Sequence, residues 1–195
     1  MAKRKTEEPL ELNEDQLEKK SSFHAISLLI GRWKEMYTDE QVKIIIAESL
    51  NFCTAYHYMK IAGYIITEKR LCLVLEIHSH ETNGMLAKFY ESVLKEIKKL
   101  RQQNDNADFK TASNEAIIKT VNLFTNLFIQ QPLTDSYLVP LITGKPVYLS
   151  YYNPQLEKLK KYIHNCNFCS ALDYSGAEGP VVVKLLHTEM GVRLK

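Results

Sequence analysis

Residues 60–78, KIAGYIITEKRLCLVLEIH, decide the fold, because they hold two apolar runs on either side of a short polar turn. The runs are Lys60–Thr67 and Leu71–His78, and Glu68-Lys69-Arg70 separates them. Both are rich in β-branched and aromatic or large aliphatic residues, which favour strands. Two such runs at this spacing predict an antiparallel β-hairpin.

The second strand of this hairpin has two unlike faces, since successive side chains point to opposite sides of a strand. One face is apolar throughout and comprises Leu71, Leu73, Leu75 and Ile77. The other face is mixed and comprises Cys72, Val74, Glu76 and His78. This pattern predicts a sheet with helices packed on the apolar face and an opposite face that is partly open.

A strand and a helix are predicted before the hairpin. Phe23–Ile30 is short, apolar and followed by Gly31, which is typical of a strand. Thr38 and Gln41 have the spacing of a capping box, so a helix begins there and is expected to run to about Tyr58. Its apolar positions have the i, i+3, i+4 spacing of a half-buried face, and they are Val42, Ile45, Ile46, Leu50 and Cys53.

After the hairpin the sequence predicts two further helices. The first runs from about Met85 to Gln102, with Leu86, Phe89, Val93, Ile97 and Leu100 facing inward. A polar loop follows at 102–110. Ser113 then caps the second helix. Its apolar stripe comprises Ile117, Val121, Phe124 and Phe128.

The last third of the chain is more irregular. Prolines and glycines interrupt residues 132–152, which indicates a segment without long elements. Asn153-Pro154 combines an N-cap with a proline at the first helical position, so a short helix through Leu156, Leu159 and Ile163 is expected there. Pro180–Leu186 is predicted to be the last strand.

The order β-α-β-β-α, with further helix and a late strand, predicts an α+β fold. Within that class we expect the ferredoxin-like, split βαβ arrangement, an antiparallel sheet packed by helices, with extra C-terminal helices. Residues 1–20 are polar and rich in both charges, and predict a flexible tail. Residues 21–195 then form a single domain with a helical insertion at about 102–143.

Composition excludes several classes of protein. The 195 residues are 45% hydrophobic and 25% charged, as in globular proteins, and the formal net charge is only +2. Bulk charge therefore gives no argument for nucleic-acid binding. No apolar run approaches the roughly 18 residues of a membrane span. Four cysteines without a regular framework favour free thiols and a reducing compartment, so we expect a cytoplasmic protein.

Several short segments resemble a known family when taken in order. They are 49–53 (SLNFC), 59–66 (MKIAGYII), 71–74 (LCLV), 144–149 (GKPVYL), 162–165 (YIHN) and 169–176 (CSALDYSG), and Phe23-His24 precedes them. This series resembles the REP-associated tyrosine transposases of the Bacteroidetes type, which are relatives of the single-tyrosine HUH transposases. The resemblance covers residues 22 to about 186. It implies the transposase variant of the ferredoxin-like fold and binding of hairpin or single-stranded DNA.

The family's chemistry needs two parts. Two histidines at i and i+2 on a strand hold a divalent metal such as magnesium, and a helical tyrosine attacks the scissile phosphate. The resemblance places the nucleophile at Tyr162 and the former metal ligands at Arg70 and Cys72. Arginine has no lone pair for a metal, but its guanidinium can bind a phosphate. The chain also departs from the family after Asn165, where it passes almost at once to Cys169. We therefore expect no metal cofactor and a transposase-like protein that has lost strand cleavage.

The residues expected to contact DNA lie near Tyr162. They are Arg70, Lys158, Lys160, Lys161 and His164. Three tyrosines, Tyr148, Tyr151 and Tyr152, have the character of base-stacking residues beside a basic groove. The structural alternatives are a solvated basic helix face, ordinary loop tyrosines and, for Tyr162, a half-buried ring at a helix rim.

Three other interpretations remain open from the residues alone. Cys72, Glu76, His78 and His164 have the types needed for a relocated metal site, although any alternating strand end produces such a pattern. His164, Cys166 and Cys169 resemble half of a zinc site, without a second pair at zinc-finger spacing. The chain as a whole could instead be an interaction module that has lost DNA binding and self-associates as a homodimer through a sheet edge.

Overall fold

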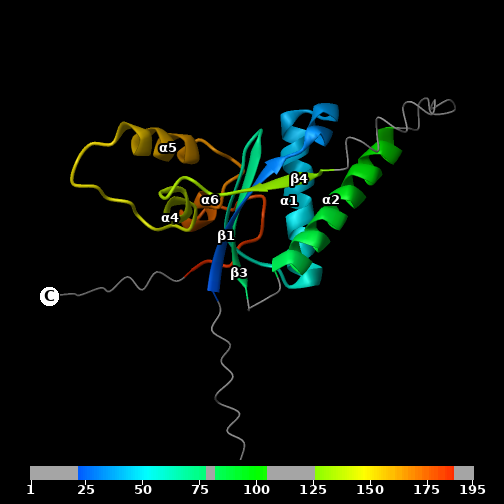
Figure 1. Ribbon diagram of the computed structural model, residues 1–195, viewed down its shortest axis with the longest axis horizontal. Coiled ribbons are helices and arrows are strands. Elements are labelled where there is room, and N and C mark those ends of the chain that lie inside the picture. The colour runs from blue at the N-terminus through cyan, green and yellow to red at the C-terminus, as the bar shows by residue number, and fades with distance from the viewer. Residues whose placement is uncertain (1–21, 78–81, 105–125, 187–195) are drawn as a thin grey trace, which may run out of the picture.

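The computed structural model describes residues 22–77, 82–104 and 126–186, and these build an α+β structure around a four-stranded sheet (Figure 1). Its strands are β1 (Ser22–Ile30), β2 (Lys60–Ile66), β3 (Arg70–Ile77) and β4 (Phe128–Gln131). Their order in the sheet is β2-β3-β1-β4, and every neighbouring pair is antiparallel. The larger helices are α1 (Asp39–His57), α2 (Thr82–Asn104) and α5 (Pro154–His164). Short helices complete the order, namely η2 (Arg32–Met36), α4 (Leu138–Ile142) and α6 (Ala171–Tyr174).

The predicted hairpin is confirmed as β2 and β3. Its register pairs Tyr64 with Leu73 and Ile66 with Leu71, and an irregularity falls between Ile61 and Gly63. The turn is closed by Thr67, whose hydroxyl accepts a hydrogen bond from the Arg70 N–H at 2.9 Å. The Thr67 N–H donates to the Arg70 carbonyl at 2.8 Å, and the threonine side chain adds a second local contact.

The predicted capping box at the start of α1 is also confirmed. The Thr38 hydroxyl accepts from the Gln41 N–H at 3.3 Å, and the Gln41 side chain accepts from the Thr38 N–H at 2.9 Å. The helix ends at His57, and Tyr58 follows it in the left-handed conformation with φ of 55°. The local sequence therefore determines both ends of this helix within a residue of the prediction.

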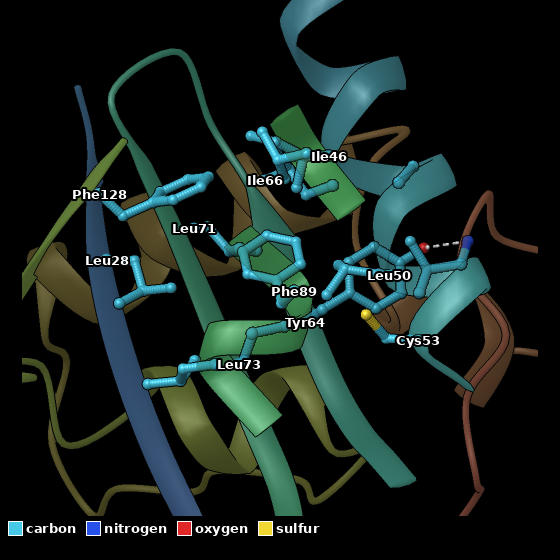
Figure 2. Close-up of a cluster of buried hydrophobic side chains, with 14 of the residues drawn as sticks. Leu28, Ile46, Leu50, Cys53, Tyr64, Ile66, Leu71, Leu73, Phe89 and Phe128 are labelled. Atoms are coloured by element: carbon cyan, nitrogen blue, oxygen red, sulfur yellow. Dashed lines mark hydrogen bonds between the residues drawn. The ribbon is translucent and has the colours of Figure 1, made fainter. Parts of the chain in front are cut away.

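The main core lies between the sheet and the helices α1 and α2, which cover the same face (Figures 1 and 2). Leu71 and Leu73 of β3 meet Leu50 of α1 and Phe89 of α2 in this cluster. The predicted inward positions of α2 are buried from Leu86 to Ile97. Burial of large aliphatic and aromatic side chains contributes about 1.5–3 kcal/mol each, which makes this layer the main source of stability.

The opposite face of the sheet is partly open, as the strand pattern predicted. Cys72 and Val74 are buried there against Ile142 of α4 and Ile163 of α5, so its β2–β3 half is covered. Short helices far along the chain supply this second layer, and no local pattern in β3 could signal them. The β1–β4 half is open, because Phe23 is 50% exposed and Ile129 is 46% exposed.

Two predictions about individual elements are wrong. Phe128 does not belong to a helical stripe, because it begins β4 and pairs with Ile30 of β1. This strand therefore lies inside the stretch expected to be a helical insertion at about 102–143. The helix expected from Ser113, with Ile117, Val121 and Phe124, lies outside the described residues. So does most of the expected loop at 102–110, although α2 itself continues to Asn104.

The predicted last strand is the second error, because Pro180–Leu186 is extended but belongs to no sheet. Proline has no N–H to donate to a neighbouring strand. The side chain of Asn51 acts in place of a strand, since its Nδ2 donates to the Pro180 carbonyl and its Oδ1 accepts from the Val182 N–H, both at 2.9 Å. One backbone hydrogen bond, from Lys184 to Ile61 at 2.7 Å, joins this segment to β2.

Candidate nucleic-acid interface

Helix α5 carries the residues that the sequence singled out near Tyr162. Asn153 caps it by accepting hydrogen bonds from the N–H groups of Gln155 and Leu156 at 3.0 and 3.1 Å, as its sequence predicted. Leu156 and Ile163 are the buried residues of this helix. Ile163 packs in the same cluster as Cys72, so α5 covers the sheet face to which the side chain of Cys72 belongs.

The two positions that the resemblance assigns to the metal ligands, Arg70 and Cys72, differ in their surroundings. Arg70 begins β3 and is exposed, and its side chain has no ion-pair partner among the described residues. Cys72 is buried, and its Sγ lies 3.8 Å from the hydroxyl oxygen of Ser27, to which it donates. Burial raises the pKa of Cys72, with the Ser27 hydrogen bond and the Arg70 charge acting in the opposite direction. Cys72 is therefore a neutral core thiol, and Arg70 is a free surface cation.

Tyr162 lies at the rim of α5, 49% exposed. It lines a groove of about 470 Å³ whose charged lining is mainly acidic, with one cation, Lys43, beside the three carboxylates of Asp39, Glu40 and Glu68. Burial raises the pKa of Tyr162, and Cys166, Glu68 and Cys169 add to the effect. Raising the pKa keeps the phenol protonated, and the carboxylates repel a phosphate. Both effects weaken Tyr162 as a nucleophile toward DNA.

The residues at the former ligand positions do not fit a divalent metal. Within the described part of the chain, no group of three His, Cys, Asp or Glu side chains is arranged to hold a metal ion. Glu76, one member of the suggested relocated site, is buried and its Oε2 lies 2.6 Å from the ammonium of Lys184. His78 lies outside the described residues. We therefore derive no step through a metal.

The three residues of the suggested half zinc site, His164, Cys166 and Cys169, differ in burial. Cys169 is fully buried, and burial raises its pKa to about 12. It forms an isolated bridge with Ile65 that extends the pairing of β2. Cys166 is half-buried and lines the Tyr162 groove. A thiol with so high a pKa is a poor source of the thiolate that binds zinc.

The three lysines of α5 differ in whether they form an ion pair. Lys160 forms an ion pair with Glu157 at 2.9 Å, one turn away. Lys158 and Lys161 are exposed and have no ion-pair partner among the described residues. Positions three or four apart share a helix face, so Lys158 lies on the same face as Tyr162, whereas Lys161 precedes Tyr162 directly and points to a neighbouring face of the helix. His164 is exposed at the carboxyl end of the helix.

Sequence reasoning missed the acidic side of this site. Asp39 and Glu40 were interpreted only as part of a capping box, and Glu68 only as part of a turn. Their approach to Tyr162 depends on how α5 packs across the sheet, which is a long-range feature. A signal was present in the sequence, because acidic residues in the first turn of α1 and in the hairpin turn both fall at one end of the predicted sheet.

No family model matches this chain, no curated protein matches it, and no solved structure matches it. The described residues include no helix long and apolar enough to cross a membrane. The class that fold and site define is an α+β protein with a basic helix rim beside an acidic groove.

Proposed function

We propose that this chain is a DNA-binding protein related to the single-tyrosine transposases and that it does not cut DNA. The observation that carries the proposal is the placement of α5. This helix, which carries the exposed Lys158 and Lys161, packs through Ile163 in the cluster that covers Cys72, two residues after Arg70 on β3. In the family that the sequence resembles, the strand that holds the metal and the helix that holds the tyrosine lie together, and the resemblance assigns these roles to β3 and α5.

We also propose that the fold is the ferredoxin-like one that the transposases use. The strand order β2-β3-β1-β4 supports this, because β3 lies between β1 and β2 and runs antiparallel to both. The connection from β1 through α1 to β2 is then a split βαβ unit. Helices α4, α5 and α6 are additions on the second face of the sheet.

Loss of cleavage follows from three residues. Arg70 stands where a ligand is needed and cannot bind a metal. Cys72 is buried and protonated. Tyr162 keeps the nucleophile position but has a raised pKa beside Glu68. The remaining role for Arg70 is direct, since a guanidinium donates two parallel hydrogen bonds to one phosphate.

The proposal is tested by fluorescence anisotropy of the full chain with a labelled DNA hairpin that has a single-stranded flank. We expect Arg70→Ala to weaken binding about tenfold at low salt, since a hydrogen bond to a charged group contributes about 1.5–3 kcal/mol. Lys98→Ala is the matched control, because Lys98 is an exposed cation of α2 on the other face of the sheet. Equal losses in both variants, or none in either, would contradict the assignment of Arg70.

A protein-interaction module without DNA binding is the second candidate. The exposed side chains of Phe23 and Ile129 on the open half of the sheet favour it. Self-association would then use the open β1–β4 half of the sheet, because the chain's own residues already bond to the outer edge of β2. Cys169 bridges Ile65 there, and the N–H of Lys184 donates to Ile61. Light scattering of the chain and of Phe23→Ser tests it, and a concentration-dependent dimer lost in the variant is the supporting result.

A further inference from the structure

Three tyrosines in the connection from α4 to α5 are unusually exposed. Tyr148 is 85% exposed, Tyr151 is 62% exposed and Tyr152 is 79% exposed. The connection, residues 143–153, belongs to no strand and reaches outward from the body of the protein as the yellow segment in Figure 1. A tyrosine in a folded protein ordinarily packs its ring and leaves only the hydroxyl in water. Three exposed aromatic rings within five residues therefore form a surface whose apolar faces are accessible to a ligand.

Both ends of this tyrosine segment are held in place. At the first end the Lys145 N–H donates to the Pro140 carbonyl at 2.8 Å, and Gly144 has φ of 70°. A Cβ at Gly144 would come within 2.3 Å of the Tyr174 ring, so only glycine allows this close approach. At the other end Asn153 caps α5. Anchors at both ends limit the space that the rings explore, which lowers the entropy lost when a ligand binds.

The charge within the segment has one sign. The chain contains no acidic residue between Asp135 and Glu157. Lys145 is exposed within the segment, and Lys158 and Lys161 are exposed on the helix that follows. Of the nearest carboxylates along the chain, Glu157 is paired with Lys160. A ligand that fits this surface is polyanionic and has flat apolar faces.

We propose that Tyr148, Tyr151 and Tyr152 stack against the unpaired bases of a single-stranded nucleic acid while the neighbouring lysines contact its phosphates. This inference rests on the proposed function, because it names the part of the nucleic acid that the tyrosine segment takes. Aromatic stacking with phosphate contacts is sequence-tolerant, since every base has a π-face. Four residues from Tyr148 to Tyr151 span at most about 10 Å along the chain, so the rings can reach neighbouring bases of one strand.

The test separates bases from phosphates. The probes are a labelled twelve-nucleotide thymidine strand and an abasic strand of the same length, measured by fluorescence anisotropy with the full chain. The two strands carry the same phosphates, so lysine contacts alone bind them equally. Stacking predicts that the thymidine strand binds about tenfold or more tightly than the abasic one. Equal affinity for the two strands would overturn the proposal.

Tyrosine variants assign the effect to the segment. Tyr151→Leu and Tyr152→Leu are expected to lower affinity for the thymidine strand toward that of the abasic strand, and the corresponding phenylalanine variants are expected to retain it. Tyr56→Leu is the control, because Tyr56 is 68% exposed on α1, outside the segment. Exposed side chains of this kind contribute little to folding, so the variants should melt like the parent. A loss in Tyr56→Leu as large as in the segment variants would overturn the assignment.

A spectroscopic arm reports stacking directly. The chain has one tryptophan, Trp33, which is fully buried, so its emission provides a constant background. In Tyr151→Trp the added emission should be quenched by the thymidine strand and unchanged by the abasic strand. A ribonucleotide strand distinguishes RNA from DNA, and tyrosine dependence with either sugar supports the proposal. Quenching that is the same with both the base-bearing and the abasic strand would contradict it.

The outcome also separates this inference from the proposed function. If Arg70→Ala weakens hairpin binding but the abasic and thymidine strands bind alike, DNA binding stands and stacking by the tyrosine segment is wrong. If neither the hairpin nor any strand binds above the level of a plain duplex, the proposed function and the inference both fail.

Discussion

Ser170 is a residue whose small hydroxyl joins three parts of the structure. Its Oγ accepts a hydrogen bond from the Tyr64 N–H at 2.8 Å, and it donates to the carbonyl of Ile142 in α4. Its own N–H donates to the Tyr64 carbonyl at 3.0 Å. The side chain is fully buried, so water cannot replace these contacts.

Removing this hydroxyl should therefore be costly. We expect Ser170→Ala to lower the free energy of unfolding by about 1–3 kcal/mol, because the Tyr64 N–H is left without an acceptor in a buried site. Urea denaturation followed by circular dichroism measures the change. Ser175→Ala is the matched control, since Ser175 is exposed and its hydroxyl bonds only to the nearby Leu172 carbonyl. A loss in Ser170→Ala no greater than in the control would contradict this role.

Asp173 makes stability depend on pH. Its Oδ1 accepts from the Gly179 N–H at 3.0 Å, whereas its buried Oδ2 has no hydrogen-bond partner. Burial raises its pKa above the ordinary value of 3.8, and the Gly179 hydrogen bond acts in the opposite direction. The folded chain thus binds this proton more tightly than the unfolded chain does. The stabilisation is present at low pH and is lost as the pH rises through the raised folded pKa.

Asp173→Asn should remove that dependence, because an amide keeps the oxygen acceptor for Gly179 and carries no charge. We expect the variant to gain stability relative to the parent at pH 7.5, and the gain to shrink as the pH falls toward 4. Urea midpoints of both chains across this range provide the comparison, with other carboxylates cancelling in the difference. A difference that does not change with pH would show that Asp173 is not the group responsible.

Single residues also show which features of the structure could be predicted from neighbouring residues in the sequence. The capping pair of Thr38 and Gln41 and the cap at Asn153 were both predicted, because a cap depends on atoms within three residues. Phe128 was assigned to a helix because a four-residue strand is too short for its alternation to be distinguished from a helical stripe. Its pairing with β1 joins residues about a hundred positions apart, so no local pattern predicts it.

At the scale of elements, the C-terminal segment 179–186 acts as a strap across α1 and β2. Asn51 of α1 bonds to both Pro180 and Val182. Val181 between them is fully buried in the main core cluster. Lys184 adds the ion pair with the buried Glu76. Side chains of α1 and β3 thus hold the strap where strand pairing would hold a true strand.

The strap should come loose when its side-chain partner is removed. We expect Asn51→Ala to increase the rate of limited proteolysis within residues 179–186 several-fold and to lower the free energy of unfolding by about 1–2 kcal/mol, since two hydrogen bonds to one exposed backbone stretch are lost. Asn167→Ala serves as the control, as Asn167 is exposed beside the Tyr162 groove. Unchanged cleavage of the strap in Asn51→Ala would show that Val181 and Lys184 suffice to hold it.

The elements themselves divide into those that local patterns predict and those that they do not. Strand β1, helices α1 and α2, and the β2–β3 hairpin were all predicted from periodicity and turn residues. The strap was taken for a strand because Val181, Val182 and Val183 are strand formers, and a side chain of a helix 130 residues earlier cannot be foreseen as its partner. Helix α4, only five residues long, carries no periodic signal.

At the scale of the whole molecule, the sheet separates two layers with different roles. The layer of α1 and α2 holds the main core. The layer of α4, α5 and α6 covers half of the opposite face and presents the acidic groove, the α5 lysines and the tyrosine segment. The α+β class followed from the order of elements. The candidate site could be predicted only in part, because Arg70, Tyr162 and the lysines were proposed from the family resemblance, whereas the burial of Cys72 and the carboxylates near Tyr162 arise from packing.

Binding without cutting is the central claim, and one mixture tests both halves of it. The full chain is incubated with a labelled hairpin bearing a single-stranded flank, in magnesium, manganese or zinc, with plain duplex as competitor and at two salt concentrations. Anisotropy is read first, and the same samples then go onto a denaturing gel. The account predicts salt-sensitive binding that prefers the hairpin, with the DNA recovered intact. Equal weak binding to hairpin and duplex would contradict the DNA-binding half, and a covalent protein–DNA adduct lost in Tyr162→Phe would contradict the loss of cleavage.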